Sequence, residues 1–353
     1  MSGSRATDRR LFARKLDLTQ GTVDMNHGSG GKAMAQLVRE LFAPAFANPL
    51  LDQGNDQAVF EVAAGRMVVT TDGFVVSPLF FPGGDIGSLA VHGTVNDIAM
   101  AGARPLHLTA GFILEEGFPL AELKRVVDSM ARAAREAGVA VVAGDTKVVE
   151  RGKGDGVFIT TTGIGVAVPG VAPSGERARP GDAILVSGTL GDHGVAIMST
   201  REGLGFETAV RSDSAALHGL VAAMVAAVPD VHVLRDPTRG GLATTLNEIA
   251  DQSGVGMLLR EADIPVRAEV AAACELLGLD PLYVANEGKL IAVCAAGDAA
   301  RLLAAMRAHP LGAESAVIGT VVADPHRFVQ METRFGGRRI VDWLTGEQLP
   351  RIC

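Results

Sequence analysis

Apolar and polar positions follow two different periods along this chain, and their alternation predicts a mixture of helices and strands. Leu120 to Glu136 repeats apolar residues at helical spacing and ends before Gly138, and Asp85 to Ala101 has the pattern of a helix with an aspartate N-cap. Short β-branched runs, Val68 to Thr71 and Val139 to Ala143, predict strands. The expected fold class is therefore α/β, in the broad sense that includes α+β.

A break rich in proline, glycine and charge at residues 169–180 separates two such mixed halves. We expect a mobile N-terminal extension (1–22), an N-terminal domain (23–168), a C-terminal domain (169–345) and a flexible tail (346–353). Further strands are predicted at residues 58–61, 106–114, 157–166, 183–187, 256–260, 290–295 and 315–322. Further helices are predicted at residues 33–42, 192–202, 214–228, 238–252, 268–277 and 298–309.

Composition narrows the class of protein. Hydrophobic residues make up 48% of the 353, enough for a large core, while aromatics are 4% and the net charge is -8. Few stacking faces and an acidic surface argue against a nucleic-acid partner. No apolar run approaches 18 residues and no signal peptide is visible, so we expect no membrane contact. Three cysteines without a CxxC pair suit a reducing compartment, and we expect a cytoplasmic protein.

Four aspartates beside predicted strands or inside a helix could bind a metal ion. Asp56 precedes a predicted strand, Asp72 and Asp145 each follow one, and Asp97 lies within a helix beside Asn96, where helix propensity does not favour it. Carboxylate oxygens at one sheet edge suit Mg²⁺, which takes further ligands from phosphates and water. A role in turns or caps remains open for each aspartate taken singly.

The segment His27 to Lys32 is rich in glycine and leads into a predicted helix. Free amides at a helix N-terminus bind phosphate, although the P-loop spacing is absent and a simple flexible loop fits equally well. Lys32 and Lys147 could neutralise phosphate charge, or could be ordinary exposed lysines.

Cys353 is the last residue of the sequence, whereas Cys274 and Cys294 lie in apolar periodic segments and are expected to be buried. We expect the Cys353 side chain to be exposed and movable, with a thiol pKa raised by the adjacent α-carboxylate. It therefore suits a carrier better than a nucleophile, and a thiol without function remains open. Glu287, between a turn and a predicted strand, could be a general base or a turn residue.

These residues together resemble the HypE family of hydrogenase-maturation proteins. That family belongs to the superfamily of aminoimidazole ribonucleotide synthetase, selenophosphate synthetase and thiamine-monophosphate kinase. The likeness runs from about Asp24 to Cys353, and the terminal Pro350–Cys353 is the mark specific to the family. The stretches that carry it are His27–Lys32, Thr71–Gly73, Pro78–Gly84, Gly93–Ala99, Gly111–Gly117, Gly144–Val149, Val186–Gly194, Arg235–Gly241, Ala285–Lys289 and Pro350–Cys353.

The resemblance implies a two-domain PurM-like fold. Its N-terminal half would bind ATP and form a β-barrel with the partner subunit of a homodimer, and its C-terminal half would be an α+β sandwich. By position, Mg²⁺ would be held by Asp56, Asp72, Asp97 and Asp145. The nucleotide would be held by His27, Gly28, Gly30, Gly31, Lys32, Thr71, Asn96 and Thr146. Asn55 departs from the family, which often has an acidic residue there, and this leaves the number of Mg²⁺ ions open.

The resemblance also implies a reaction. A carbamoyltransferase, HypF, would load Cys353 with a carbamoyl group, which ATP-dependent dehydration would convert to a thiocyanate. Glu287 would act as base, and Lys147 would belong to the catalytic group. The HypC–HypD complex would then receive the cyanide for the iron of a [NiFe] hydrogenase. Two alternatives remain: an ATP-dependent enzyme of the same superfamily with a small free substrate, and a nucleotide-binding thiol-carrier scaffold without catalysis.

Overall fold

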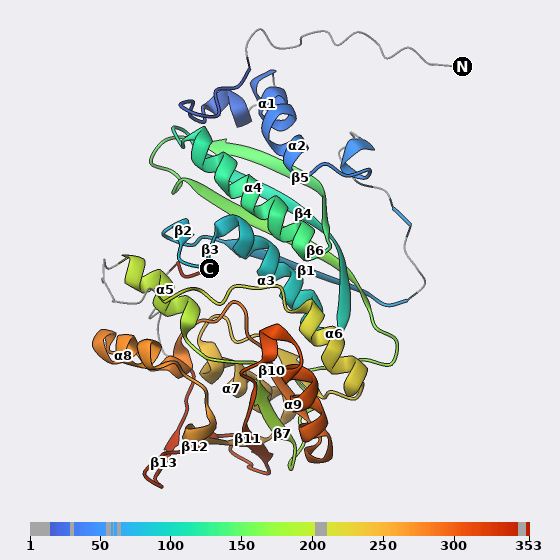
Figure 1. Ribbon diagram of the computed structural model, residues 1–353, viewed down its shortest axis with the longest axis vertical. Coiled ribbons are helices and arrows are strands. Elements are labelled where there is room, and N and C mark those ends of the chain that lie inside the picture. Colours follow the sequence, from blue (N-terminus) through green and yellow to red (C-terminus); the bar gives the residue numbers. More distant parts are fainter. Residues whose placement is uncertain are drawn as a thin grey trace.

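A computed structural model of the chain describes residues 15–28, 32–53, 58, 60–61, 65–201, 210–344 and 351–353. Two α/β domains lie one above the other, and the C-terminal residues return to the level between them (Figure 1). The predicted break at residues 169–180 falls in the loop that joins the last strand of the first domain to the first strand of the second. The mixed two-domain architecture expected from the sequence is confirmed.

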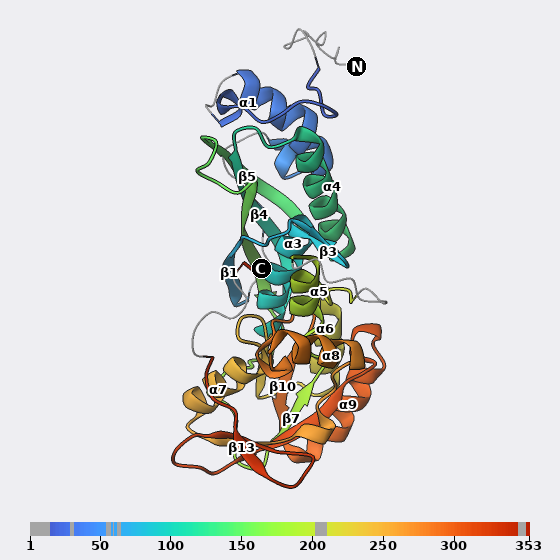
Figure 2. The same cartoon turned by 90° about the vertical axis from the view of Figure 1, so that its left-hand side faces the viewer.

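The N-terminal domain is built on a four-stranded sheet in the order β1-β6-β4-β5. Strand β6 pairs antiparallel with β1 and β4, and β5 pairs parallel with β4. Helices α3 and α4 cover one face of this sheet (Figure 2). The elements are β1 (Met67–Phe74), β4 (Ala103–Glu115), β5 (Ala140–Val149), β6 (Val157–Ala167), α3 (Ile86–Met100) and α4 (Leu120–Glu136).

Local signals explain why the covering helices form where they do. Asp85 caps α3, since its Oδ1 accepts hydrogen bonds from the amides of Gly87 (2.8 Å) and Ser88 (3.0 Å). Helix α4 has the predicted bounds and buries one apolar face. Strand β5 runs six residues beyond its predicted end at Ala143, so that Asp145 lies inside the strand rather than after it.

The other face of this sheet carries exposed apolar side chains. Met67 and Val69 of β1 are 47% and 65% exposed, and Ile113 of β4 is 42% exposed. The pairing of both strands with β6 places these three side chains on the same face, because side chains alternate along each strand. We call this surface the open face.

The C-terminal domain holds a seven-stranded sheet in the order β13-β12-β9-β11-β7-β10-β8. The strands β8, β12 and β13 were not predicted, because three or four residues are too few to show a period. The strands are β7 (Ala183–Val186), β8 (Val233–Arg235), β9 (Gly256–Arg260), β10 (Ile291–Cys294), β11 (Ala316–Val322), β12 (Val329–Glu332) and β13 (Arg338–Ile340). The helices are α5 (Asp192–Arg201), α6 (His218–Ala227), α7 (Gly241–Ser253), α8 (Ala268–Leu277) and α9 (Ala299–Arg307).

Short elements complete the N-terminal domain. The predicted helix at residues 33–42 appears as α1 (Lys32–Leu37) followed by a π-helical turn, with α2 (Ala43–Ala45) next. A small hairpin of β2 (Phe80–Phe81) and β3 (Gly84–Asp85) precedes α3. Ala58, Phe60 and Glu61 belong to no strand, so the strand predicted there is wrong.

The N-terminal extension differs from the prediction at its end. Residues 15–22 are bonded to the domain instead of hanging free: the amide of Leu16 donates to Glu40 (2.6 Å) and Thr22 bridges Pro119. Residues 1–14 lie outside the described residues. No helix in the described ranges is long and apolar enough to span a membrane.

The two domains share packing and hydrogen bonds. Ala99 and Met100 of α3 join a hydrophobic cluster made otherwise of C-terminal-domain residues. The buried Asn96 side chain donates to the carbonyls of Ala215 (3.0 Å) and Glu287 (3.2 Å) and accepts from the amide of Leu217 (2.7 Å). The relative position of the domains is thus fixed from inside α3.

Candidate functional site

The C-terminal residues 351–353 are docked between the domains. The amide of Val75 donates to the backbone oxygen of Cys353, and the amide of Ser77 donates to that of Arg351, both at 3.1 Å. The tail therefore lies along residues 75–77 in the manner of an added strand. The side chain of Ile352 is buried and joins the hydrophobic core of the N-terminal domain.

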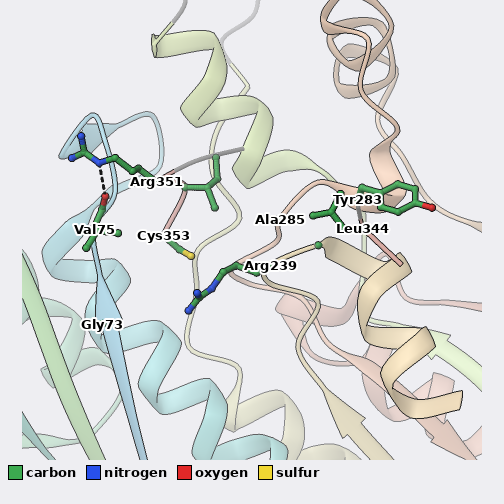
Figure 3. A pocket seen from close by; sticks show the side chains of 10 residues that line it. Gly73, Val75, Arg239, Tyr283, Ala285, Leu344, Arg351 and Cys353 are labelled. Carbon is green, nitrogen blue, oxygen red and sulfur yellow. Dashed lines mark hydrogen bonds between the residues drawn. The ribbon is translucent and has the colours of Figure 1, made fainter. Parts of the chain in front are cut away.

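Three side chains hold this docked tail. The guanidinium of Arg201 donates to the carbonyls of Ser77 (2.6 Å) and Arg351 (3.0 Å). His193 is hydrogen-bonded through Nε2 to the carbonyl of Ile352 (2.8 Å). Arg351 itself donates to the carbonyl of Val75 (3.3 Å), as Figure 3 shows. It also forms an ion pair with Asp155. These contacts fix the position of Cys353. The expectation from the sequence of an exposed and movable thiol is therefore wrong for the docked tail.

The thiol of Cys353 lines a cavity of about 260 Å³ between the domains. Its sulfur and the side chain of Arg239 point toward one another (Figure 3). Burial raises the pKa of the Cys353 thiol, the neighbouring Glu287 adds to the rise and Arg239 opposes it, which together bring the pKa to about 12. The raised pKa expected from the sequence is confirmed, but burial is its main cause.

Glu287 is buried next to this cavity, with 3% of its surface exposed. Its bend is held by Asn286, whose side chain accepts from the amide of Gly191 (2.8 Å) and donates to the carbonyl of Pro237 (3.1 Å). Gly288 packs so closely that a Cβ there would lie 1.7 Å from the carbonyl oxygen of Asp213, so only glycine fits. Glu287 thus lies in a bend, in keeping with the turn role that was one of the two the sequence left open for it. Its carboxyl group is also buried.

The carboxyl group of Glu287 is strongly perturbed. Burial raises its pKa well above the ordinary value, and the acidic side chains of Asp213, Asp236, Asp72 and Asp97 raise it further. Its Oε1 is buried and has no hydrogen-bond partner among the described residues. A buried carboxyl with a raised pKa and a free oxygen is suited to general acid–base work near neutral pH.

Three aspartates form an acidic cluster on the wall of the same interdomain cleft. Asp97 accepts a hydrogen bond from Thr70 (2.8 Å), and Asp72 lies 4.0 Å from the guanidinium of Arg239. Burial raises the pKa of Asp72 and of Asp97, and it raises that of Asp236 to about 7 with help from Asp97. Asp72 and Asp97 were predicted from the sequence as metal ligands, whereas Asp236 was not predicted as a site residue.

Asp145 and Lys147 lie on β5, at the opposite edge of the four-stranded sheet from β1, the strand that carries Asp72. They form an exposed ion pair on β5 (2.9 Å), which lowers the pKa of Asp145 through the hydrogen bond from Lys147. Strand register places Asp145 level with Gly73 on β1, with β4 and β6 between them, a separation of about 14 Å at ordinary strand spacing. Among the described residues no three acidic, histidine or cysteine side chains converge to hold a metal, so the magnesium assignment stays a prediction.

The predicted nucleotide segment lies beside β5. His27 is buried and accepts from the amide of Asp24 (3.0 Å), Gly28 packs against Val148, and Lys32 begins α1. A cavity of about 600 Å³ opens between residues 34–51, which follow this segment, and strands β4 and β5; Met34, Phe42, Phe46, Leu51, Phe112, Asp145 and Thr146 are among its lining residues. Gly30, Gly31 and Asp56 lie outside the described residues.

Thr71 and Asn96 already have protein partners. The hydroxyl of Thr71 donates to the carbonyl of Thr161 (3.1 Å) and accepts from Thr162 (3.1 Å). The amide of Asn96 makes the interdomain bonds described above. Their nucleotide-binding roles stay predictions, and the structure shows Asn96 joining the domains.

Several residues of the site were not among the predicted site residues. His193, Asp236 and Arg239 lie in the stretches Val186–Gly194 and Arg235–Gly241, which were noted for the resemblance but assigned no chemistry. Helix α7 begins at Gly241, two residues after Arg239, and only glycine fits there because a Cβ would lie 2.6 Å from the carbonyl oxygens of Leu282 and Val284. Asp213 and Arg201 have no local signal, since ordinary exposed loop and helix residues share their sequence surroundings.

The fold and the matched sequence segments define the class first. Residues 54–167 match the N-terminal domain, and residues 179–332 the C-terminal domain, of AIR synthase related proteins. Within that class the chain is 73% identical over 339 residues to the carbamoyl dehydratase HypE of Azotobacter vinelandii, covering 96% of this chain and 99% of that protein.

Two solved structures carry the likeness into three dimensions. A crystal structure of the hydrogenase maturation protein HypE in complex with ATP is 54% identical, with a TM-score of 0.90 over 93% of this chain and 99% of that one. A crystal structure of a HypE–HypF complex is 50% identical, with a TM-score of 0.77 over 87% of this chain and 99% of that one. The chain belongs to the HypE family of carbamoyl dehydratases.

Proposed function

We propose that this protein dehydrates a carbamoyl group on the sulfur of its own Cys353 to a thiocyanate, at the expense of ATP. The observation that carries the proposal is the docked tail, which places the Cys353 thiol in a cavity beside the buried carboxyl of Glu287, whose Oε1 has no hydrogen-bond partner in the described part of the chain. The family's name, carbamoyl dehydratase, supports the reaction type.

The reaction must remove one oxygen and two N–H protons from Cys–S–C(=O)–NH₂. ATP, when bound, supplies the phosphoryl group that turns the carbamoyl oxygen into a leaving group, so that ADP and phosphate are the by-products. Glu287 in its ionised form takes up one proton from the carbamoyl nitrogen, which its raised pKa allows it to hold near neutral pH, and the second proton leaves with the phosphate. Arg239, facing the sulfur, offsets negative charge that develops on the departing oxygen.

The nucleotide fits beside β5. The cavity of about 600 Å³ is mostly apolar, as a purine ring requires, and it ends at Asp145 and Thr146, next to the segment that begins with His27 and Gly28. A HypE relative was crystallised with ATP, which supports ATP binding in this family. Lys32 and Lys147 would neutralise phosphate charge there.

Magnesium fits the acidic cluster in chemistry. Asp72 and Asp97 crowd together with raised pKa values, and a divalent cation would offset the repulsion between these hard oxygen donors. Asp145 would join such a site only if β5 of another subunit faced the cluster.

We infer a homodimer for this reason. The acceptor half-site, with Cys353 and Glu287, and the nucleotide half-site, with Asp145 and Lys147, are separated within one chain by two strands. The apolar open face around Val69 and Ile113 gives a second copy a surface on which to pack. A dimer closed over the open faces would bring the acceptor half-site of one subunit to the nucleotide half-site of the other.

The proposed partners of this protein act on its C-terminal tail. The carbamoyltransferase HypF is proposed to load Cys353, and the crystallised HypE–HypF complex of a relative supports that contact. The HypC–HypD complex is proposed to take the cyanide group. Both exchanges require the tail to leave its groove, and the exposed Arg351–Asp155 ion pair adds little to the cost of that step.

The test is intact mass after incubation with HypF, carbamoyl phosphate and ATP, and again after further ATP and Mg²⁺. The carbamoyl adduct should form and then lose the mass of one water, and neither change should occur in Cys353→Ala. An adduct that survives ATP unchanged would refute the dehydratase reaction.

The shared site has its own test. Cys353→Ala and Lys147→Ala are each expected to be inactive, while dimers mixed from both should regain activity, since one composite site keeps both groups. Mixed dimers without activity would place the whole site within one subunit.

A further inference from the structure

The ring of His193 lies fully buried at the start of α5 and connects the tail to the C-terminal domain. Its Nε2 is 2.8 Å from the carbonyl oxygen of Ile352, and its Nδ1 is 2.8 Å from the hydroxyl of Ser212. The ring of Phe81 stands edge-on to it at 5.6 Å between centroids. Packing and two hydrogen bonds together leave this imidazole one orientation.

The donor and acceptor of each hydrogen bond between Ile352, His193 and Ser212 follow from the groups at the two ends of this series. The carbonyl of Ile352 can only accept, so Nε2 of His193 carries the hydrogen and donates it. Nδ1 must then accept from the hydroxyl of Ser212, which in turn accepts from the amide of Ser214 (3.1 Å). Burial lowers the pKa of His193, which keeps the ring in this neutral form.

The residue between the two serines connects the same segment to Glu287. Asp213 accepts a hydrogen bond from the amide of Glu287 (3.1 Å) and one from Lys289 (3.1 Å). Its backbone carbonyl packs against Gly288, as described above. The segment Ser212–Ser214 thus contacts the bend that holds Glu287 directly, and it contacts the tail through His193.

The segment is tied to the N-terminal domain as well. The amide of Ser212 donates to the carbonyl of Pro82 (2.8 Å), and the hydroxyl of Ser214 is hydrogen-bonded to His92 of α3 (2.9 Å). It therefore behaves as a fixed frame shared by both domains rather than as a loop that follows the tail.

We propose that His193 is a positioning residue for the reaction, and that Ser212–Ser214 is the frame that sets the tail and Glu287 at one fixed separation. The inference rests on the proposed function, because it takes the docked tail as the reactive state. Reaction rates depend steeply on such placement, since a shift of about 1 Å can lower a rate a hundredfold. His193 touches only the backbone of the tail, so it acts through Cys353 and takes no part in the bond changes.

The variants follow from the ring's geometry. His193→Leu keeps apolar bulk but leaves the Ile352 carbonyl without its donor, whereas His193→Gln keeps an N–H near the Nε2 position. Ser212→Ala removes the donor to Nδ1 and serves if His193→Leu does not fold. His232→Gln is the matched control, because His232 is equally buried in the same domain and is bonded to Asp182 (2.7 Å) away from the tail.

The first readout is the rate at which iodoacetamide alkylates Cys353 at pH 8, followed by intact mass. Docking protects this thiol through burial. His193→Leu should raise the alkylation rate about threefold to tenfold, equivalent to ~0.7 to 1.4 kcal/mol of lost docking free energy. His193→Gln and His232→Gln should remain near wild type, and Ser212→Ala should fall between.

The second readout is single-turnover dehydration after loading by HypF. His193→Leu should accept the carbamoyl group at least as fast as wild type but dehydrate it at least threefold more slowly, and His193→Gln should restore the rate. Wild-type alkylation in His193→Leu and Ser212→Ala, or equal damage in His193→Gln, would overturn the positioning role. If wild type loads but never dehydrates, the proposed function fails, and the alkylation rates still decide whether His193 holds the tail.

Discussion

Asp236 gives the sharpest test of the electrostatics of the interdomain cleft. Burial and the neighbouring Asp97 raise its pKa from the ordinary 3.8 to about 7. A difference of about 3 between folded and unfolded pKa values corresponds to about 4 kcal/mol. Because the side chain borders an open cleft where solvent screens part of the effect, we expect about 2 to 4 kcal/mol.

The sign of the effect follows from the direction of the pKa shift. An acid whose pKa is raised by folding binds its proton more tightly in the folded state, so its contribution to stability is present below pH 4. That contribution is lost as the pH rises toward 7 and stays lost above it. Asp236→Asn removes this loss, so the variant should exceed wild type in stability by about 2 to 4 kcal/mol at pH 8 and by less than about 1 kcal/mol at pH 4.

The assay is urea denaturation at pH 4 and pH 8 without divalent ions, followed by the fluorescence of Trp343. This is the only tryptophan in the sequence, and it lies in the same domain as Asp236. Asp230→Asn is the control, because the pKa of that exposed aspartate is lowered by Arg177 and the change should not stabilise the protein. Equal wild-type and Asp236→Asn stability at pH 8 would refute the reasoning.

Three further outcomes can be checked together. Glu287→Gln keeps the buried shape but removes the base, so dehydration should fall about 10²- to 10⁴-fold while carbamoyl loading by HypF persists; undiminished dehydration would exclude Glu287 as the base. Gly288→Ala forces a Cβ against Asp213, and its free energy of unfolding should drop by more than about 2 kcal/mol in urea, whereas Gly297→Ala, with open space around it, should change little. Asp155→Asn removes an exposed ion pair from Arg351 and should speed Cys353 alkylation less than twofold; a larger change would make this pair a main latch.

Local signals in the sequence were enough for much of the fold. The helix at Leu120–Glu136 and the capping role of Asp85 were predicted as observed, because apolar period and capping chemistry are properties of neighbouring residues. The strand predicted at residues 58–61 was wrong, and β8, β12 and β13 were missed, because runs of three or four residues carry too little pattern to decide between strand and loop.

The site was predictable only in part. Cys353 and Glu287 were singled out from the sequence, and the structure places them beside one cavity. Asp145 was grouped with Asp72 because both follow strand-like runs, yet strand order puts two strands between them. Their meeting in one active site would require a second subunit, which no local pattern can reveal.

The sequence by itself determined the longer helices and strands, the two-domain division and the placement of a cysteine at residue 353, apart from the two in apolar segments. The tertiary structure alone decided that this cysteine is docked, that His193 and Ser212 hold it, and that Asp213 lies between the tail and the base. The physical reason is the separation along the sequence over which each kind of interaction acts. Period and capping act over a few residues, whereas burial and hydrogen bonding between residues 193, 213, 287 and 353 depend on how distant segments pack.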